Sequence, residues 1–210
     1  MWCGARGKSA HDFGKSVTGW IRPPGPIAQG LRIGLLGGSF NPAHDGHLYV
    51  SDVALKRLKL DYVWWLVSPG NPLKSEKGMA SFADRLQGAR ALAQHPRIIV
   101  TGIERDMGTR FTADTVAALK RRFPQGHFTW LMGSDNLAGF DRWRNWQAIA
   151  AAIPIAVVQR PGSILARHNA ALVRRFGTVR TLKALMVPPA VAVLDGRRNP
   201  QSATALRAAW

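Results

Sequence analysis

Two histidines three residues apart, His44 and His47, are the side chains in this sequence best suited to chemistry. They follow a glycine pair, Gly37 and Gly38, which comes directly after an apolar run at residues 33–36. A glycine lets the backbone approach a ligand closely, and the first amides of a helix favour an anion. Two imidazoles beside such a loop can donate hydrogen bonds to a phosphate that gains negative charge during a reaction.

Two other interpretations of this histidine pair stay open. The pair could bind a metal ion, although no Cys or Glu nearby completes a usual set of ligands. It could also be two surface histidines, which is the more frequent case for an isolated H-x-x-H. The glycine loop before the pair, and Gly46 within it, favour the phosphate interpretation.

The elements that must position this pair alternate between strand and helix from Leu31 onward. Short apolar runs predict strands at residues 33–36, 62–67, 97–101, 128–132, 155–158 and 190–194. Helical spacing predicts helices at residues 48–58, 81–94, 112–122, 143–153, 163–175 and 202–207, with Thr112 as a candidate N-cap. This alternation predicts an α/β fold, in which a doubly wound, mostly parallel sheet forms a single domain. Ligands of such sheets bind beyond the carboxyl ends of the strands, where the strand order reverses.

Length, charge and cysteine content restrict the class of protein further. The chain has 210 residues, enough for one domain with a full core, and a formal net charge of +17. That charge indicates anionic partners, which could be nucleotides, nucleic acid or a membrane surface. Cys3 is the only cysteine, so an intrachain disulfide is impossible and a reducing compartment such as the cytoplasm fits. No apolar run is long enough to span a bilayer.

Residues 1–30 differ in composition from the rest of the chain. They are rich in Gly, Pro and Ser, have no sustained periodicity and lack the apolar segment of a secretory signal. We expect a flexible, basic N-terminal extension at residues 1–30, followed by a domain at residues 31–210. A basic arm that touches a partner and an upstream start-codon artefact stay open as alternatives.

Two motifs at opposite ends of the chain resemble those of the H-x-G-H nucleotidyltransferase superfamily. Gly38–His47 matches every position of the signature G-x-F-x-P-x-H-x-G-H. Ser202–Arg207 is similar to the S-[SA]-T-x-[IL]-R element, although Gln201 stands where an aliphatic residue is usual. Class I aminoacyl-tRNA synthetases share the short histidine motif, but they need a K-M-S-K-S loop and a far longer chain. The resemblance implies a Rossmann-like nucleotidyltransferase fold.

Segments in the middle of the chain resemble one family within this superfamily, nicotinate-nucleotide adenylyltransferase. Thr109–Thr115 is similar to S-Y-T-x-D-T, Gly133–Leu137 to G-x-D-x-L, and Arg160–Gly162 to R-P-G. Trp143 stands at the position of a tryptophan that precedes an aliphatic residue. The segment Pro72–Lys74 departs from the usual P-H-K because it lacks the histidine. The resemblance extends over residues 31–207.

This resemblance implies transfer of the adenylyl group of ATP to nicotinate mononucleotide, with release of pyrophosphate, in NAD biosynthesis. It implies Mg²⁺ bound with ATP and no dedicated metal site in the protein. The catalytic residues that it implies are His44, His47 and Arg207. The ATP-binding residues that it implies are Gly38, Ser39, Phe40, His44, His47, Gly133, Asp135, Ser202, Thr204 and Arg207. The implied contacts to nicotinate mononucleotide are Lys74, Thr109, Arg110, Phe111, Thr112, Trp143 and Arg160.

Several alternatives remain for function and for single residues. Nicotinamide mononucleotide could replace the nicotinate substrate, because the two differ only in an amide and a carboxylate. Pantetheine-phosphate adenylyltransferases usually have Thr at the position of His44, which argues against that activity. A basic nucleic-acid-binding protein fits the charge, but no recognised nucleic-acid motif is present. Trp143 could be a core aromatic and Asp135 a helix cap. The oligomeric state, including a homo-oligomer, stays open.

Overall fold

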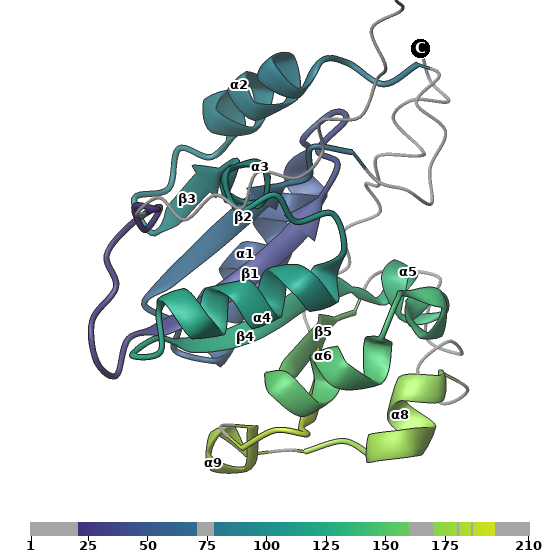
Figure 1. The fold of residues 1–210 in the computed structure, drawn as a ribbon. Helices are drawn as coiled ribbons and strands as arrows, with labels where there is room; N and C mark the ends of the chain where they lie inside the picture. Colours follow the sequence, from purple (N-terminus) through teal and green to yellow (C-terminus); the bar gives the residue numbers. More distant parts are fainter. Residues whose placement is uncertain (1–20, 71–77, 160–169, 180, 186, 196–210) are drawn as a thin grey trace, which may run out of the picture.

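The centre of the molecule is a six-stranded sheet with the strand order β3-β2-β1-β4-β5-β6 (Figure 1). The computed structural model describes residues 21–70, 78–159, 170–179, 181–185 and 187–195. All strand pairs are parallel, and helices flank the sheet. The predicted α/β fold with a doubly wound, parallel sheet is therefore confirmed. Within the described residues, no helix is long and apolar enough to cross a membrane.

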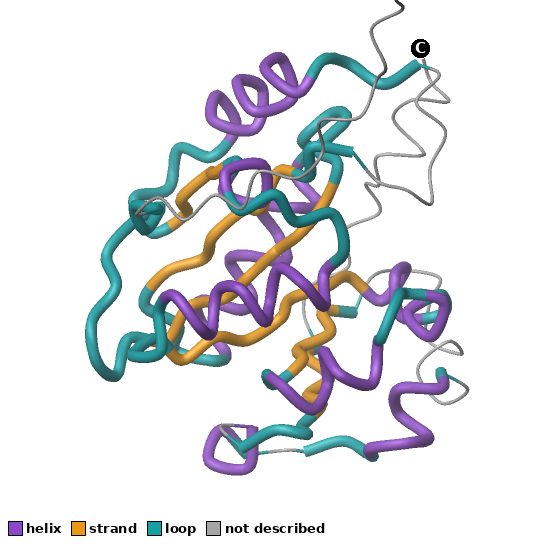
Figure 2. The backbone as a smooth tube through the Cα atoms, viewed as in Figure 1, coloured by secondary structure: helices purple, strands orange, loops and turns teal. Residues whose placement is uncertain are grey.

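The alternation of strand and helix in the structure agrees closely with the alternation predicted from the sequence (Figure 2). The strands are β1 Arg32–Gly38, β2 Tyr62–Val67, β3 Ile98–Thr101, β4 His127–Gly133, β5 Ile155–Val158 and β6 Val191–Leu194. The longer helices are α1 Asp45–Arg57, α2 Phe82–Leu92, α4 Thr112–Arg122 and α6 Trp146–Ala152. The shorter helices are α3 Ile103–Asp106, α5 Ser134–Leu137, η1 Phe140–Arg142, α8 Ala171–Phe176 and α9 Leu182–Leu185. All six predicted strands are confirmed.

The helix boundaries differ more from the prediction than the strands do. α1 begins at Asp45 rather than Leu48, because His44 caps it. Thr112 is the first residue of α4 and not its N-cap, which is Phe111 and makes no side-chain hydrogen bond. The helix predicted from Trp143 begins only at Trp146. Of the helix predicted at residues 163–175, residues 171–175 lie in a helix of the structure, and residues 163–169 lie outside the described residues. The helix predicted at residues 202–207 also lies outside them.

Each face of the sheet packs against its own layer of helices. In β2, Val63, Trp65 and Val67 belong to a hydrophobic cluster that includes side chains of α1 and α2. Trp64 and Leu66 belong to a second cluster, with side chains of α3, α4 and α6. This alternation follows from the period of two along a strand. Figure 1 shows α1 behind the sheet and α4 and α6 in front of it.

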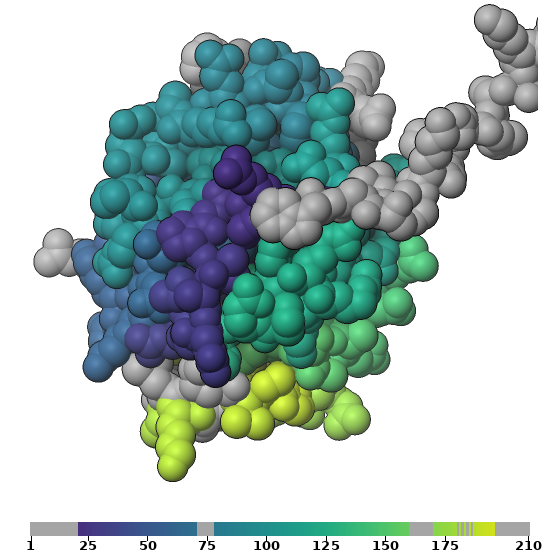
Figure 3. Space-filling view, turned by 60° about the vertical axis from the view of Figure 1, so that its left-hand side comes forward, coloured from purple at the N-terminus to yellow at the C-terminus, as the bar shows by residue number. Residues whose placement is uncertain are grey.

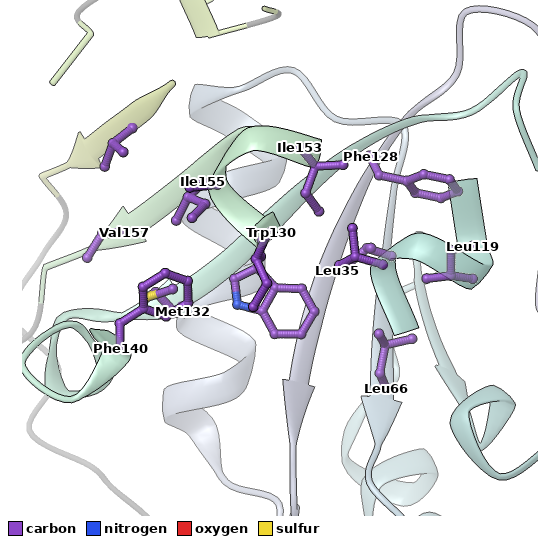
Figure 4. Close-up of a cluster of buried hydrophobic side chains, with 14 of the residues drawn as sticks. Leu35, Leu66, Leu119, Phe128, Trp130, Met132, Phe140, Ile153, Ile155 and Val157 are labelled. Carbon is purple, nitrogen blue, oxygen red and sulfur yellow. The ribbon is translucent and has the colours of Figure 1, made fainter. Parts of the chain in front are cut away.

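Gly37 lies within β1, where the indole of Trp130 packs directly over it. A Cβ at Gly37 would lie 2.6 Å from Cη2 of Trp130. Trp130 is only 1% exposed and is surrounded by the second cluster (Figure 4), so its rigid ring has little room to move. The strand thus continues through the glycine pair, beyond its predicted end at residue 36, and close packing requires a glycine at position 37.

Gly37→Ala is therefore expected to lower the free energy of unfolding by about 1–3 kcal/mol, the usual cost of overpacking a core. Gly88→Ala is the matched control, because Gly88 lies in α2 and a Cβ there has nothing within 4 Å. That change should stabilise the protein by about 0.5–1 kcal/mol. Urea unfolding of both variants measures the difference, and equal stability of the two would contradict the packing argument.

The described start of the chain, residues 21–30, lies against the domain and is not detached from it. Ile21 and Ile27 are half-buried against the second cluster, and Gly25 lies beside Ile99 and the indole of Trp64. Figure 3 shows this purple segment running across the surface of the molecule. Residues 21–30 thus contact the domain through isolated apolar side chains, and the flexible extension at residues 1–30 stays a prediction. Residues 1–20 lie outside the described residues.

Candidate functional site

The strand order reverses between β1 and β4, which are neighbours in the sheet. Leu36 of β1 pairs with Leu131 of β4, so that Gly38 and Gly133 end their strands at the same edge. The loops that leave these two ends diverge toward α1 and α5. A doubly wound sheet opens a crevice for a ligand at this point. The structure thus brings together two segments expected to bind one ligand, Gly38–Phe40 and Gly133–Asp135.

His44 and His47 cap α1 reciprocally. His44 Nδ1 accepts a hydrogen bond from the amide of Gly46 at 3.0 Å, and His47 Nδ1 accepts one from the amide of His44 at 3.2 Å. The two ring centroids are 4.0 Å apart. This arrangement is a capping box built from histidines, which otherwise uses Ser or Thr with Glu or Gln. The pair is therefore part of the helix start and is not two independent surface histidines.

The capping bonds determine which ring nitrogen can act on a ligand. Each Nδ1 accepts a backbone N–H, so in the neutral ring the proton resides on Nε2. His44 is 5% exposed, which restricts its ring to this orientation. Each ring thus carries its N–H on Nε2 near the N-terminus of α1, where the helix dipole also favours negative charge. Such an arrangement can bind a phosphate and stabilise charge that develops on it.

Phe40 supports the ring of His47 from the loop after β1. Its own backbone is left-handed, with φ of 50°, and its side chain is 1% exposed. The ring centroid of Phe40 lies 4.5 Å from that of His47 and 5.1 Å from that of Trp65. Trp65 Nε1 also donates to Ser51 Oγ, which donates to the carbonyl of His47. The ring of His47 is thus held by aromatic packing as well as by its cap.

The loop between α3 and α4 contains the next group of expected site residues. Thr109 donates its amide to the carbonyl of Glu104 at 2.9 Å. Arg110 is exposed, whereas Phe111 and Thr112 are half-buried at the start of α4. The guanidinium carbon of Arg144 lies 4.6 Å from the centroid of the Phe111 ring, an arrangement that permits a cation–π interaction. This contact joins the loop to the segment that contains Trp143.

Trp143 is half-buried, and its ring rests on two core aromatics. Its centroid lies 6.0 Å from that of Trp130 in an edge-on arrangement and 5.1 Å from that of Phe140. Because Trp130 also packs over Gly37, this contact connects Trp143 to the carboxyl end of β1. The indole is therefore partly a core aromatic, and its remaining exposed surface can stack on a planar ligand.

Glu104 is a buried carboxyl group beneath the Thr109 loop, and the sequence analysis did not identify it. It is 7% exposed, and Thr115 Oγ1 lies 3.0 Å from its Oε1 and 2.9 Å from Thr109 Oγ1. A hydroxyl has one proton, so when Thr115 donates to the ionised carboxylate of Glu104, it cannot also donate to Thr109. Burial raises the pKa of Glu104 to about 7, against the opposing effect of the Thr115 hydrogen bond. The only signal in the sequence was an acidic residue three positions after the end of a predicted strand.

The raised pKa of Glu104 predicts stability that falls as the pH rises. The folded protein retains this proton up to about pH 7. The unfolded chain loses it near pH 4.5, so it binds fewer protons between these two values. The raised pKa therefore lowers the free energy of unfolding by about 3 kcal/mol above pH 7, and this effect vanishes below about pH 4.5. Glu104→Gln removes this effect. The free energy of unfolding of the variant, relative to that of the unaltered protein, should therefore increase by about 2 kcal/mol from pH 5 to pH 8.

Denaturant unfolding at both pH values measures this difference. Asp106→Asn is the control, because it removes an exposed carboxylate from the same short helix. A difference between Glu104→Gln and the unaltered protein that stays constant between pH 5 and pH 8 would contradict the raised pKa.

Arg85 and Asn41 tie the loop after β1 to the start of α2, and neither was assigned a role from the sequence. Arg85 is 4% exposed and donates to four backbone carbonyls, including that of Ser39. Asn41 Oδ1 accepts from the amide of Ala80. The signal that could have identified Arg85 is its place on the buried side of an amphipathic helix, three residues after Phe82.

A cavity of about 240 Å³ lies at the opposite ends of the strands, away from the histidines. Basic side chains on its lining include Arg32, Lys120 and His127. Arg32 and His127 begin β1 and β4, so this hollow is separated from the crevice by the length of the sheet. It is therefore not part of the candidate site.

Five expected site residues lie outside the described residues: Lys74, Arg160, Ser202, Thr204 and Arg207. Their roles stay predictions. Within the described ranges, no group of three or more His, Cys, Asp or Glu side chains could hold a metal ion. His44 and His47 thus have no third ligand there for a metal site.

Curated relatives and a family model match most of the chain. The Cytidylyltransferase-like family model matches residues 35–209. A protein of Parvibaculum lavamentivorans, described as a probable nicotinate-nucleotide adenylyltransferase, is 53% identical over 187 residues, 86% of this chain and 93% of that protein. A Brucella suis protein of the same description is 44% identical over 183 residues, 84% of this chain and 94% of that protein.

The fold also matches a solved structure. The nicotinic acid mononucleotide adenylyltransferase of Plasmodium falciparum, complexed with NaAD, superposes with a TM-score of 0.65. That match covers 85% of this chain and 83% of the other at 16% sequence identity. The likeness at this identity shows a shared fold.

Proposed function

This chain belongs to the family of nicotinate-nucleotide adenylyltransferases, and we propose that it joins the adenylyl group of ATP to nicotinate mononucleotide. A phosphate oxygen of the mononucleotide attacks the α-phosphorus of ATP, the bond from that phosphorus to the β-phosphate oxygen breaks, and pyrophosphate leaves. The products are nicotinate adenine dinucleotide and pyrophosphate. The observation that carries this proposal is the capping box of His44 and His47 at the switch point of the sheet.

The histidine pair supplies the charge stabilisation that this reaction needs. Phosphoryl transfer requires little covalent participation by the protein, so catalysis comes mainly from positioning and electrostatic stabilisation. We assign the Nε2–H groups of His44 and His47 to phosphate oxygens that gain charge as pyrophosphate leaves. Gly38, Ser39 and Phe40 form the loop that lies beside those phosphates. Their conformation is supported by the packing of Phe40 against His47.

We place the pyridine on the other side of the crevice, against Trp143. The exposed part of the indole stacks on the pyridine ring. The segment Thr109–Thr112 lies beside the pyridine, because Phe111 contacts Arg144, the residue after Trp143. Gly133 and Asp135, at the end of β4, are assigned to ATP and its ribose. The two substrates then meet above the carboxyl ends of β1 and β4.

Residues outside the described ranges complete the proposal from sequence resemblance alone. Ser202 and Thr204 would donate hydrogen bonds to the triphosphate, with Arg207 as a fixed positive charge. Lys74 and Arg160 would bind the anionic mononucleotide. Mg²⁺ bound with ATP would offset negative charge on the phosphate oxygens. The described residues contain no carboxylate cage, which suits an ion that retains most of its water ligands.

Pyrophosphate release tests this function directly. The protein is incubated with ATP and Mg²⁺, and then with nicotinate mononucleotide or nicotinamide mononucleotide added singly. We expect release only when ATP and a mononucleotide are both present, and formation of the dinucleotide in equal amount. Pyrophosphate release that needs no mononucleotide, or no release with either one, would overturn the proposal.

A further inference from the structure

Arg85 is a buried cation that binds backbone carbonyls from three separate segments. Its Nη1 donates to Ser39 at 2.6 Å and to Ser68 at 2.8 Å, its Nη2 to Pro69 at 3.3 Å, and its Nε to Ala80 at 3.1 Å. Ser39 follows β1, and Ser68 and Pro69 follow β2. The guanidinium thus lies between the loops at the carboxyl ends of two neighbouring strands, and the loop after β1 borders the crevice.

Stability alone does not explain why a charged side chain is buried at this position. Within the described part of the chain, no carboxylate lies within ion-pair distance of Arg85, so its charge is balanced only by carbonyl dipoles. Burial lowers the pKa of the guanidinium, which still remains charged at neutral pH. An apolar side chain of similar size commonly stabilises a buried position as well as a buried charge does. What an apolar side chain lacks is a fork of donors that can hold several carbonyls at once.

The bond to Ser39 orients the peptide that leads into Phe40. In a trans peptide the C=O and the following N–H point in opposite directions. Because Arg85 holds the carbonyl of Ser39, the amide of Phe40 points away from the guanidinium. The same bond restrains the left-handed backbone of Phe40, whose ring packs on His47. Arg85 therefore acts on both the loop amides and the histidine ring.

A second, more exposed link joins the same two segments. Asn41 Oδ1 accepts from the amide of Ala80 at 3.1 Å, and Asn41 Nδ2 donates to the carbonyl of Gly78 at 3.3 Å. The start of α2 thus contacts the loop after β1 at Ser39 and again two residues later.

We propose that Arg85 is a positioning residue for adenylyl transfer, which holds the Ser39–Phe40 peptide and the ring of His47 in place to bind the ATP phosphates. The inference rests on the proposed function. It does not require Arg85 to touch either substrate. Small misplacements of groups that position a substrate can lower a rate by about a hundredfold.

Steady-state kinetics of Arg85→Lys test this role. A lysine retains the charge but cannot donate to all the carbonyls at once. We expect kcat/KM for ATP to fall at least about tenfold, with an increase in KM for ATP. The rise in KM is the decisive readout, because partial unfolding reduces the number of active molecules and leaves their KM unchanged. Arg90→Lys is the matched control, since Arg90 is exposed on the same helix, and its KM should not change.

Each outcome decides the inference. A folded Arg85→Lys protein whose KM for ATP stays within about twofold of the unaltered value would overturn the positioning role. If Arg85→Lys does not fold, Asn41→Ala breaks the exposed link between the same segments, and the same criterion for KM applies to it. Absence of any turnover by the unaltered protein with ATP and nicotinate mononucleotide would overturn the proposed function, and this inference with it.

Discussion

His47→Gln is expected to lower kcat about a hundredfold or more while leaving Tm nearly unchanged. Glutamine is a preferred residue at the third position of a helix with a capping box, so its Oε1 can replace the Nδ1 that accepts the amide of His44. Glutamine retains a neutral N–H donor, but it cannot carry the positive charge that an imidazole can place where phosphate charge develops. The variant therefore separates the structural role of His47 from its proposed chemical role.

Two further variants complete this test. His47→Ala removes the cap as well as the donor, so it should lose about 1 kcal/mol of stability in addition to the same loss of kcat. His127→Gln is the control, because His127 is exposed at the amino end of β4. Thermal melts and initial rates are measured for all three proteins. Near-normal kcat in both His47→Gln and His47→Ala would leave the histidine with a structural role only.

The parallel sheet was predictable from the sequence because its strands are short apolar runs buried on both faces. β2 and β5 begin and end where the sequence predicted. The start of α1 was not predictable in the same way, because histidine is not among the preferred N-cap residues and His44 gave no signal of a helix start. Helices of four residues, such as α3 and α5, are too short to show a period of 3.6.

The candidate site was predictable where a motif marks it and not where packing alone makes it. The histidine motif identified His44 and His47, and the structure adds the reciprocal cap and the support from Phe40. Arg85 acts through contacts with distant segments and Glu104 through contacts with the loop and helix that follow it, so no functional motif marks either residue. A charged residue on the buried side of a helix, or shortly after a strand, is the pattern worth noting in such sequences.

The choice between the two pyridine mononucleotides is the second large effect that we expect, and it depends on the first turn of α4. The amide of Thr109 already donates to the carbonyl of Glu104. No described residue accepts a hydrogen bond from the amides of Thr112 and Ala113, because α4 has no side-chain cap. The N-terminal turn of a helix favours a negative group through these amides and the helix dipole. The carboxylate of nicotinate mononucleotide is the group that can use them.

This geometry predicts a preference for nicotinate over nicotinamide mononucleotide of at least about tenfold in kcat/KM. An amide in place of the carboxylate turns an N–H toward the helix amides and leaves buried donors unpaired, at a cost of about 1–3 kcal/mol. Each factor of ten corresponds to about 1.4 kcal/mol. Steady-state kinetics with both mononucleotides at matched ATP measure the ratio. Equal values, or a preference for nicotinamide, would overturn the assignment of the carboxylate while leaving the adenylyl transfer itself intact.

Arg110→Ala distinguishes the helix amides from the neighbouring guanidinium as the source of this preference. Arg110 is exposed, so its charge is screened by solvent and adds little selectivity. If the amides of α4 make the contact, the variant should retain the ratio of the two kcat/KM values within about threefold. A ratio that falls to one would assign the contact to the side chain of Arg110. The ratio of the two kcat/KM values therefore decides whether the amides of α4 or the guanidinium of Arg110 bind the carboxylate.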